Sequence, residues 1–329
     1  MSAGQPLVIA RIDPIEYPGQ ISPHVHSVNG GNGFSPNSTF NDLRNSTCTT
    51  NLVTEDKSNY WVPRLYFHDR ANNSYINVPN GGLLVYYLQR TEPGEKINAF
   101  PAGFQMVTGN NSKRARNWPH NIRDLPQWDN MSFTEQQDAL TELSITWTCF
   151  GKKSYSSRDQ NQTSAFPSTD CPNGFRSELF FPSCWDGKNL DSQHVAYPDR
   201  HDSGVCPPGY PVRLPSIFYE HTWDTGVFSS LWPSNGEWPF EWGMQDPTGW
   251  GFHGDFLNGW DVDILQQAMD KCTDPSGVIE RCEVFTSHKL LQTPKEQDAC
   301  KIEDPFNEHA DGVIADNGDA QPNGPVNGK

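Results

Sequence analysis

Histidines next to acidic and aromatic residues are the part of this sequence best suited to chemistry. The stretch ISPHVHSVNGGNGF, residues 21–34, sets His24 and His26 one residue apart. On a strand, alternate side chains point to the same face, so these rings would lie about 6 to 7 Å apart. The stretch GWGFHGDFLNGWDVD, residues 249–263, places His253 and Asp255 among glycines and aromatic residues. Such groups suit acid–base catalysis or a metal site.

The leading hypothesis is a glycoside hydrolase acting on polysaccharide without a required cofactor. Glycosidic cleavage typically uses two carboxyl groups, one protonated and one ionised. Acidic residues also occur in FPSCWDGKNLDSQHVAYPDRH, residues 181–201, and in FYEHTWDTG, residues 218–226. The candidate catalytic residues are Asp13, His26, Asp186, His194, Glu220, Asp224, His253 and Asp255. Each carboxylate has an alternative structural role as a helix cap, a turn-closing residue or an ion-pair partner.

Aromatic side chains beside these polar groups are typical of sugar-binding clefts, because a ring stacks on the face of a sugar. The candidate substrate-binding residues are Trp185, Tyr197, Trp223, Trp250 and Trp260. A tryptophan is nonetheless more often part of a hydrophobic core than of a binding surface. A wall-binding module without catalysis is therefore an alternative function.

A metal site is the second hypothesis. His24 and His26, on one face of a strand, would be completed by His253, His194 or Asp255, and the candidate ligand set is His24, His26 and His253. Imidazole with carboxylate suits a divalent ion such as zinc, copper or manganese, and an open coordination position would make the site catalytic. The sequence contains no G-x-G-x-x-G, G-x-x-x-x-G-K-[ST], G-x-S-x-G or H-E-x-x-H motif. Nucleotide binding, serine esterase chemistry and zincin chemistry therefore have no support.

Composition predicts the framework that must position these groups. The 329 residues include 27 glycines, 27 prolines, 11 tryptophans, 18 phenylalanines and 10 tyrosines, which favours short strands and long ordered loops. A net charge of −16 argues against nucleic acid and anionic membrane surfaces as partners. We expect a mainly β fold, an antiparallel β-sandwich or jelly roll with disulfide-stapled loops and a few short helices.

Local patterns predict the individual elements. Strand-like runs occupy residues 61–67, 82–88, 104–108, 143–150 and 216–223. Helical patterns cover 261–272, after an acidic start, and 132–143, where Ser132 and Glu135 form a capping box. The glycines around Asp255 predict a tight, ordered loop. One β-rich catalytic domain is expected over residues 1–302, followed by an acidic tail rich in Gly, Asn and Pro over 303–329.

Eight cysteines in an even set, without the C-x-x-C pairs typical of zinc, predict four disulfides whose pairing the sequence leaves open. Glycosylation sequons begin at Asn37, Asn45, Asn72, Asn110, Asn130 and Asn161. Together these features predict a secreted, extracellular protein, and we expect a monomer. No apolar run has the length of a membrane span, and the first residues lack the pattern of a leader, so the sequence is expected to be a mature form.

Seven stretches, in order, resemble a known family. They are RIDPI with PGQISPHVHSVNGGNGF, YWVPRLY, GGLLVYYL, FPAGFQMVTGN, FPSCWDGKNLDSQHVAYP, CPPGYPVRLPSIFYE and PTGWGFHGDFLNGWD. The chain is similar, from about Arg11 to Cys272, to a secreted fungal domain-of-unknown-function family that is often joined to WSC and cellulose-binding modules. The resemblance implies a cell-wall or biomass setting and no particular chemistry. The chain departs from the family pattern at WGMQDPTG, which leaves the role of Asp246 open.

Overall fold

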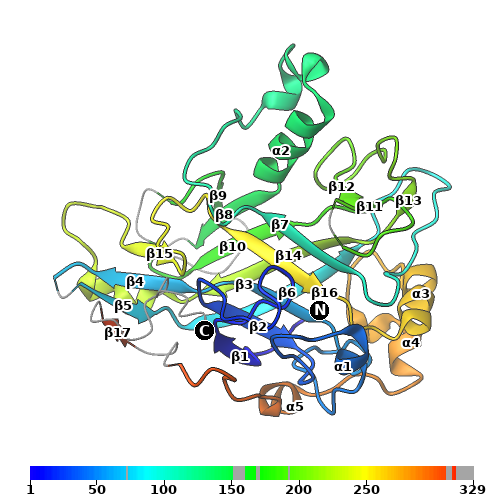
Figure 1. Ribbon diagram of the computed structural model, residues 1–329, viewed down its shortest axis with the longest axis horizontal. Helices are drawn as coiled ribbons and strands as arrows, with labels where there is room; N and C mark the ends of the chain where they lie inside the picture. Colours follow the sequence, from blue (N-terminus) through cyan, green and yellow to red (C-terminus); the bar gives the residue numbers. More distant parts are fainter. Residues whose placement is uncertain (72, 151–159, 168–170, 192, 309–312, 316–329) are drawn as a thin grey trace.

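The computed structural model describes residues 1–71, 73–150, 160–167, 171–191, 193–308 and 313–315 (Figure 1). The chain is mainly β with a few short helices, as predicted, and the strand pairs within these residues are antiparallel. Among the helices of this described part, none is long and apolar enough to cross a membrane.

Two five-stranded sheets form the centre of the molecule (Figure 1). The first has the order β1 (Val8–Ala10), β2 (His26–Gly30), β3 (Asn59–Pro63), β16 (His253–Leu257) and β7 (Gln105–Gly109). The second has the order β6 (Asn80–Leu88), β14 (Ser216–Trp223), β10 (Phe175–Phe180), β8 (Ile145–Phe150) and β9 (Gln160–Thr163).

Two smaller sheets lie at the periphery. One consists of β12 (Val195–Ala196), β11 (Cys184–Trp185) and β13 (Val212–Arg213). The other consists of β15 (Phe240–Trp242), β4 (Leu65–Asp69), β5 (Ser74–Asn77) and β17 (Val313–Ala315). The stretch predicted as a tail therefore supplies an edge strand, since β17 pairs with β5.

The two large sheets pack against each other through aromatic and aliphatic side chains. Tyr60 on β3 meets Tyr219 on β14 edge-on, with ring centroids 5.9 Å apart. Only glycine fits at position 254 on β16, because a Cβ there would lie 2.6 Å from the side chain of Leu179 on β10. Side chains alternate along a strand, so this packing leaves His253 and Asp255 on the opposite face of the first sheet. The candidate site is built on that opposite face.

Helices and their caps follow the sequence signals closely. The α-helices are α1 (Phe40–Arg44), α2 (Phe133–Leu143), α3 (Val262–Lys271), α4 (Glu283–Thr286) and α5 (Pro294–Ala299). Short 3₁₀ turns cover Ile122–Asp124, Trp128–Asn130, Thr225–Leu231 and Ile279–Arg281. The predicted capping box of Ser132 and Glu135 is present, and Asp261 caps α3 by accepting a hydrogen bond from the Ile264 amide. Figure 1 shows α2 at one end of the molecule and α3 beside α4 at its side.

Strand predictions were confirmed where alternation was clear and failed where glycine dominated. β14 covers the predicted 216–223, and the predicted 61–67 divides at Arg64 into β3 and β4. The prediction of a tight loop around Asp255 was wrong, because residues 253–257 form β16, a strand paired on both sides. Glycine lowers strand propensity, but Gly254 is required here for close contact between the sheets.

The eight cysteines form four disulfides, as predicted, and the structure supplies the pairing. The bonds join Cys48 to Cys300, Cys149 to Cys171, Cys184 to Cys206 and Cys272 to Cys282. The first closes a loop of 252 residues and ties the C-terminal region to the segment that follows α1. A cross-link over so long a loop restricts the unfolded chain strongly, which stabilises the fold.

Candidate metal centre

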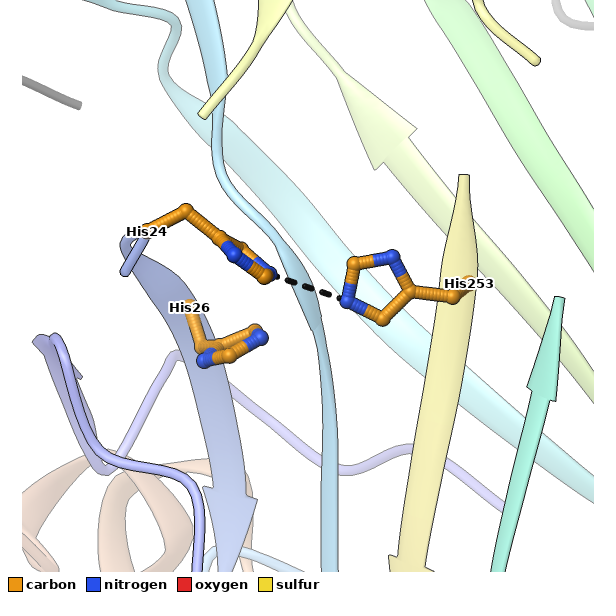
Figure 2. A group of neighbouring side chains, drawn as sticks. All are labelled: His24, His26 and His253. Carbon is orange, nitrogen blue, oxygen red and sulfur yellow. Dashed lines mark hydrogen bonds between the residues drawn. The ribbon is translucent and has the colours of Figure 1, made fainter. Parts of the chain in front are cut away.

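Three buried histidines meet on the site face of the first sheet. His26 lies opposite Pro63, and the register of β3 with β16 places His253 on the other side of the same proline. His24 precedes β2 and adds a third ring. Ring centroids lie 4.4 Å apart for His24 and His26, and 4.9 Å apart for His24 and His253. Figure 2 shows the rings of His24 and His26 facing the ring of His253 on β16.

Hydrogen bonds fix the orientation and tautomer of two of these rings. Nδ1 of His26 lies 3.0 Å from the carbonyl oxygen of Ile12, and Nδ1 of His253 lies 2.8 Å from that of Gly251. A carbonyl oxygen only accepts, so each Nδ1 carries the proton and each Nε2 keeps its lone pair. Metal-binding histidines are commonly oriented by such a bond to a backbone carbonyl.

The remaining ring nitrogens converge closely enough to share one ion. One ligand nitrogen from each ring lies within 4.8 Å of the others, and Nε2 of His24 lies 3.0 Å from Nε2 of His253. Two nitrogens bound tetrahedrally to one zinc ion lie about 3.3 Å apart, given the usual zinc–nitrogen bond length. Nε2 of His26 is buried and has no hydrogen-bond partner among the described residues. The arrangement therefore fits a three-histidine metal site.

Burial keeps the three rings neutral, which is the form that binds metals. It lowers the pKa of His24 and His26 well below the usual value, and the neighbouring imidazoles lower the pKa further. Burial also lowers the pKa of His253 to about 4. Neutral imidazoles need lose no proton to accept a metal ion through nitrogen.

An open pocket of 230 Å³ adjoins His253 and contains three carboxyl groups. Asp13, Glu16 and Asp255 line it, with Val107, Gly109, Asn110 and Asn111 completing the wall. Oδ1 of Asp13 accepts hydrogen bonds from the amides of Ile15 and Glu16, at 3.1 and 3.0 Å, which fixes its direction. Neither carboxyl oxygen of Asp255 has a hydrogen-bond partner among the described residues.

Two of these carboxyl groups have raised pKa values. Burial raises the pKa of Asp13 to about 6, against the lowering effect of the two amides. Burial raises the pKa of Asp255 well above its usual value, and the charges of Asp13 and Glu16 raise it further. Displaced pKa values of this kind are common in functional sites, where acids and bases are tuned to their task.

The loop before β16 is held by Asp246, whose role the sequence left open. Asp246 is fully buried, and its Oδ2 accepts a 2.7 Å hydrogen bond from the amide of Gly251. Its Oδ1 accepts a 2.9 Å bond from the amide of Thr248. The carbonyl of Gly251 in turn orients His253. Asp246 therefore positions His253 within the candidate metal site.

Gly109 allows β7 to pass close to His253. Gly109 pairs with His253 in the register of β7 and β16, and a Cβ on Gly109 would lie 2.4 Å from the carbonyl oxygen of Phe252. Its φ of +88° also favours glycine. A larger residue at this position would push β7 away from β16 and so change the shape of the pocket at His253.

The structure brings His24, His26 and His253 together and places Asp13 and Asp255 in the adjoining pocket. The other predicted catalytic residues do not line this pocket. Asp186 accepts hydrogen bonds from the amides of Lys188 and Asn189, which closes a turn. His194 packs its ring against Phe104, with centroids 4.9 Å apart. Asp224 follows β14 at the start of the 3₁₀ turn.

Glu220 lies on the outer face of the second sheet, opposite Glu178 of β10. It accepts a 2.8 Å hydrogen bond from the Tyr86 hydroxyl and pairs with Arg176 at 3.1 Å. Glu178 is buried and accepts hydrogen bonds from Thr146, Thr148 and Arg176. These contacts describe an ion network on a sheet surface away from the histidines.

We expect Glu178→Gln to destabilise the protein by about 1–3 kcal/mol at pH 7. Burial alone would raise the pKa of Glu178, but hydrogen bonds and the Arg176 charge outweigh it and hold the pKa below its usual value. The ionised form therefore stabilises the fold above the unfolded pKa, and this contribution disappears as the pH falls through the folded pKa. Thermal unfolding should show that the variant is less stable than wild type at pH 7, and that this difference in stability shrinks below about pH 4. Glu237→Gln, at an exposed ion pair, is the control, and an equal difference at both pH values would contradict this assignment.

The predicted substrate-binding aromatics occupy different environments. Tyr197, Trp223 and Trp260 are at most 2% exposed, and each hydrogen-bonds inside the core. Trp185 is half-buried and donates to the carbonyl of Asn189, while half-buried Trp250 packs edge-on against Trp147. The pocket of Asp13 and Asp255 is lined by none of these five rings.

Most sequon asparagines that the structure describes are exposed. Asn37, Asn45, Asn110 and Asn130 are exposed, whereas Asn72 lies outside the described residues. Asn161 lies in β9, and its backbone pairs with Cys149. Asn110 also lines the carboxyl-rich pocket, so a glycan there would stand at the pocket rim.

Two residues that line the pocket were missed by sequence reasoning. Glu16 lines the pocket, and its signal in the sequence was its place three residues after Asp13 in a turn. Asn111 was noticed only as part of a sequon, although it also lines the pocket. The turn sequence D-P-T-G, residues 246–249, could have identified Asp246 as a group that closes the loop.

Comparison with known proteins identifies a family, but the description of that family assigns no activity. A family model described as a domain of unknown function, DUF1996, matches residues 13–260. The matched segment contains His24, His26, His253, Asp13 and Asp255. No curated protein and no solved structure matches the chain.

Proposed function

Since this chain belongs to the DUF1996 family, whose description assigns no activity, we propose a function from its site: a metal-dependent hydrolase that acts on polysaccharide. Three histidines would hold one divalent transition metal, and the neighbouring carboxyl groups would move protons. The convergence of three neutral imidazoles, with two Nε2 lone pairs set by backbone hydrogen bonds, carries this proposal.

The donor set favours zinc or copper. Three nitrogen ligands, one of which, His253, also lines the pocket, resemble the ligand set of catalytic zinc sites, which keep a fourth position for water. A metal ion bound there would supply a Lewis acid and a water of lowered pKa. Asp13 is the carboxylate that we assign to accept the proton of the attacking water. Asp255 is the carboxyl that we assign to protonate the leaving group, so water adds across the bond that breaks.

Polysaccharide is proposed as the substrate on three grounds. The four disulfides and the exposed sequons fit a protein made for the extracellular space. The resemblance noted above implies a cell-wall or biomass setting. The pocket is open and polar, which suits a hydroxyl-rich ligand better than an apolar one.

A metal-free glycoside hydrolase is the second candidate function. Asp13 and Asp255 lie in one pocket, and a pair of carboxyl groups flanking a sugar is sufficient for glycosidic cleavage. In this alternative the three histidines would be structural. The two candidates differ in whether activity needs a metal.

Chelation and reconstitution test the proposed function. The full chain would be dialysed against a strong chelator, checked for metal content and assayed on a panel of fungal and plant wall polysaccharides, some of them acetylated. We expect activity to fall below about 1% and to return with one equivalent of zinc or copper, because the water loses its Lewis acid. Full activity in verified metal-free protein would favour the glycoside hydrolase instead.

A further inference from the structure

The pocket beside the histidines has an unbalanced negative charge. Asp13, Glu16 and Asp255 contribute three carboxyl groups to a space of 230 Å³. No lysine or arginine lines this space in the part of the chain that the structure describes. Ionised carboxyl groups that share a small site repel one another unless a cation lies between them or one of them holds a proton.

Asp255 gives independent evidence of a ligand in this pocket. The residue is 0% exposed, and both of its carboxyl oxygens lack a partner among the described residues. Leaving a buried polar group without a hydrogen bond is costly, so such groups generally have a partner in the working state. A hydrogen-bonding group of a ligand in the pocket would supply this missing partner.

The nearest basic side chains are engaged elsewhere. Lys113 pairs with Asp138 at 3.3 Å and with Glu142 at 2.5 Å, on the side of a neighbouring cavity. Arg114 donates to the carbonyls of Asn111 and Met244 and lies 3.7 Å from Asp246. Neither residue lines the pocket, so the protein itself does not supply the balancing cation.

We propose that this pocket binds the ammonium group of an amine-bearing sugar polymer. This inference rests on the proposed function, because it names the substrate class of the same site. A protonated sugar amine offers three hydrogen-bond donors and one positive charge, which match the acceptors of Asp13, Glu16 and Asp255. A neutral glucan offers donors without charge, and a uronic acid polymer adds negative charge to a negative pocket. The ammonium group would therefore fix the polymer next to the metal.

Calorimetric binding of matched oligosaccharides tests the substrate class. The full chain, loaded with one equivalent of zinc, would be titrated with hexamers of glucosamine, N-acetylglucosamine and glucose at equal pH and ionic strength. We expect the glucosamine hexamer to bind about 10-fold more tightly than the other two, as expected for a hydrogen-bonded charge pair. We also expect this preference to weaken with added salt.

Glu16→Gln is the informative variant, because Glu16 is exposed and its amide, rather than its carboxylate, bonds to Asp13. It should reduce the preference for glucosamine severalfold, whereas Glu237→Gln, away from the pocket, should not. Equal binding of the three hexamers, or an unchanged preference in Glu16→Gln, would overturn the inference. Binding of two metal ions per chain without competition from glucosamine would also overturn it, because the pocket would then hold a second metal.

The binding assay separates this inference from the proposed function. If the chain fails to take up zinc, the titrations with metal-free protein still measure the preference for the amine. If zinc binds and restores activity while the hexamers bind equally, the metal-dependent hydrolase stands and the amine-bearing substrate class fails.

Discussion

Replacing His26 by alanine will lower the affinity of the proposed three-histidine site for a divalent metal by at least about 100-fold, more than the loss typical of an outer hydrogen-bond partner. His26 has Nδ1 anchored to Ile12 and a buried, unpartnered Nε2 within the described residues, so it is prepared to donate one lone pair. Removing it leaves two imidazoles, which bind a divalent ion weakly.

The change will also appear in thermal stability. A metal present at 100 times its Kd stabilises the wild type by about 2.7 kcal/mol, provided that it binds only the folded chain. The melting temperature of wild type should therefore rise with added zinc, and that of His26→Ala should not. His120→Ala is the matched control, because His120 is exposed and lies outside the cluster. An identical rise in all three proteins would show that the zinc binds elsewhere.

Replacing Asp255 by asparagine will reduce polysaccharide-degrading activity by ~10²- to 10⁴-fold, the usual effect of losing a general acid or base. Asparagine has nearly the same size but cannot donate or accept a proton in the same way. The side chain of Asp255 makes no hydrogen bond with the described residues, so the variant loses no structural bond. We expect its melting temperature to stay close to that of wild type, because one buried, unpaired polar group replaces another of nearly the same size.

The matched control for Asp255→Asn is Asp261→Asn. Asp261 caps α3, a role that asparagine fills almost equally well, so this variant should keep both activity and stability. Product release and thermal unfolding would be measured on the same samples. Full activity in Asp255→Asn would contradict the catalytic role, and so would a fall in activity that only follows a fall in stability.

Local signals in the sequence predicted much of the framework. β14 and β6 have long runs of strand-forming residues, and α2 and α3 begin at capping residues, Ser132 and Asp261, which bond their own first turns. These features depend on neighbours a few residues away, so a single sequence contains them. β16 was missed because its glycine is explained only by contact with Leu179 on another sheet.

The sequence predicted that histidine and carboxyl groups would form the site, but only some of the candidate residues lie there. His24 and His253 are 229 residues apart in the chain, and their contact depends on β16 pairing with β3 rather than with its neighbours in sequence. A different long-range pairing, that of β14 with β10, places Glu220 on the outer face of the other sheet. Chemically similar motifs are therefore separated by topology, which spacing along the sequence does not encode.

Metal content and coordination of the purified full chain test the central claim most directly. The protein would be purified without chelators, analysed for metals and examined by X-ray absorption spectroscopy at the metal edge. We predict one transition metal ion per chain with three nitrogen ligands at about 2.0–2.1 Å, and its loss in the His26→Ala variant. A chain that binds no transition metal when supplied in excess, or one whose metal has no histidine ligands, would contradict the account.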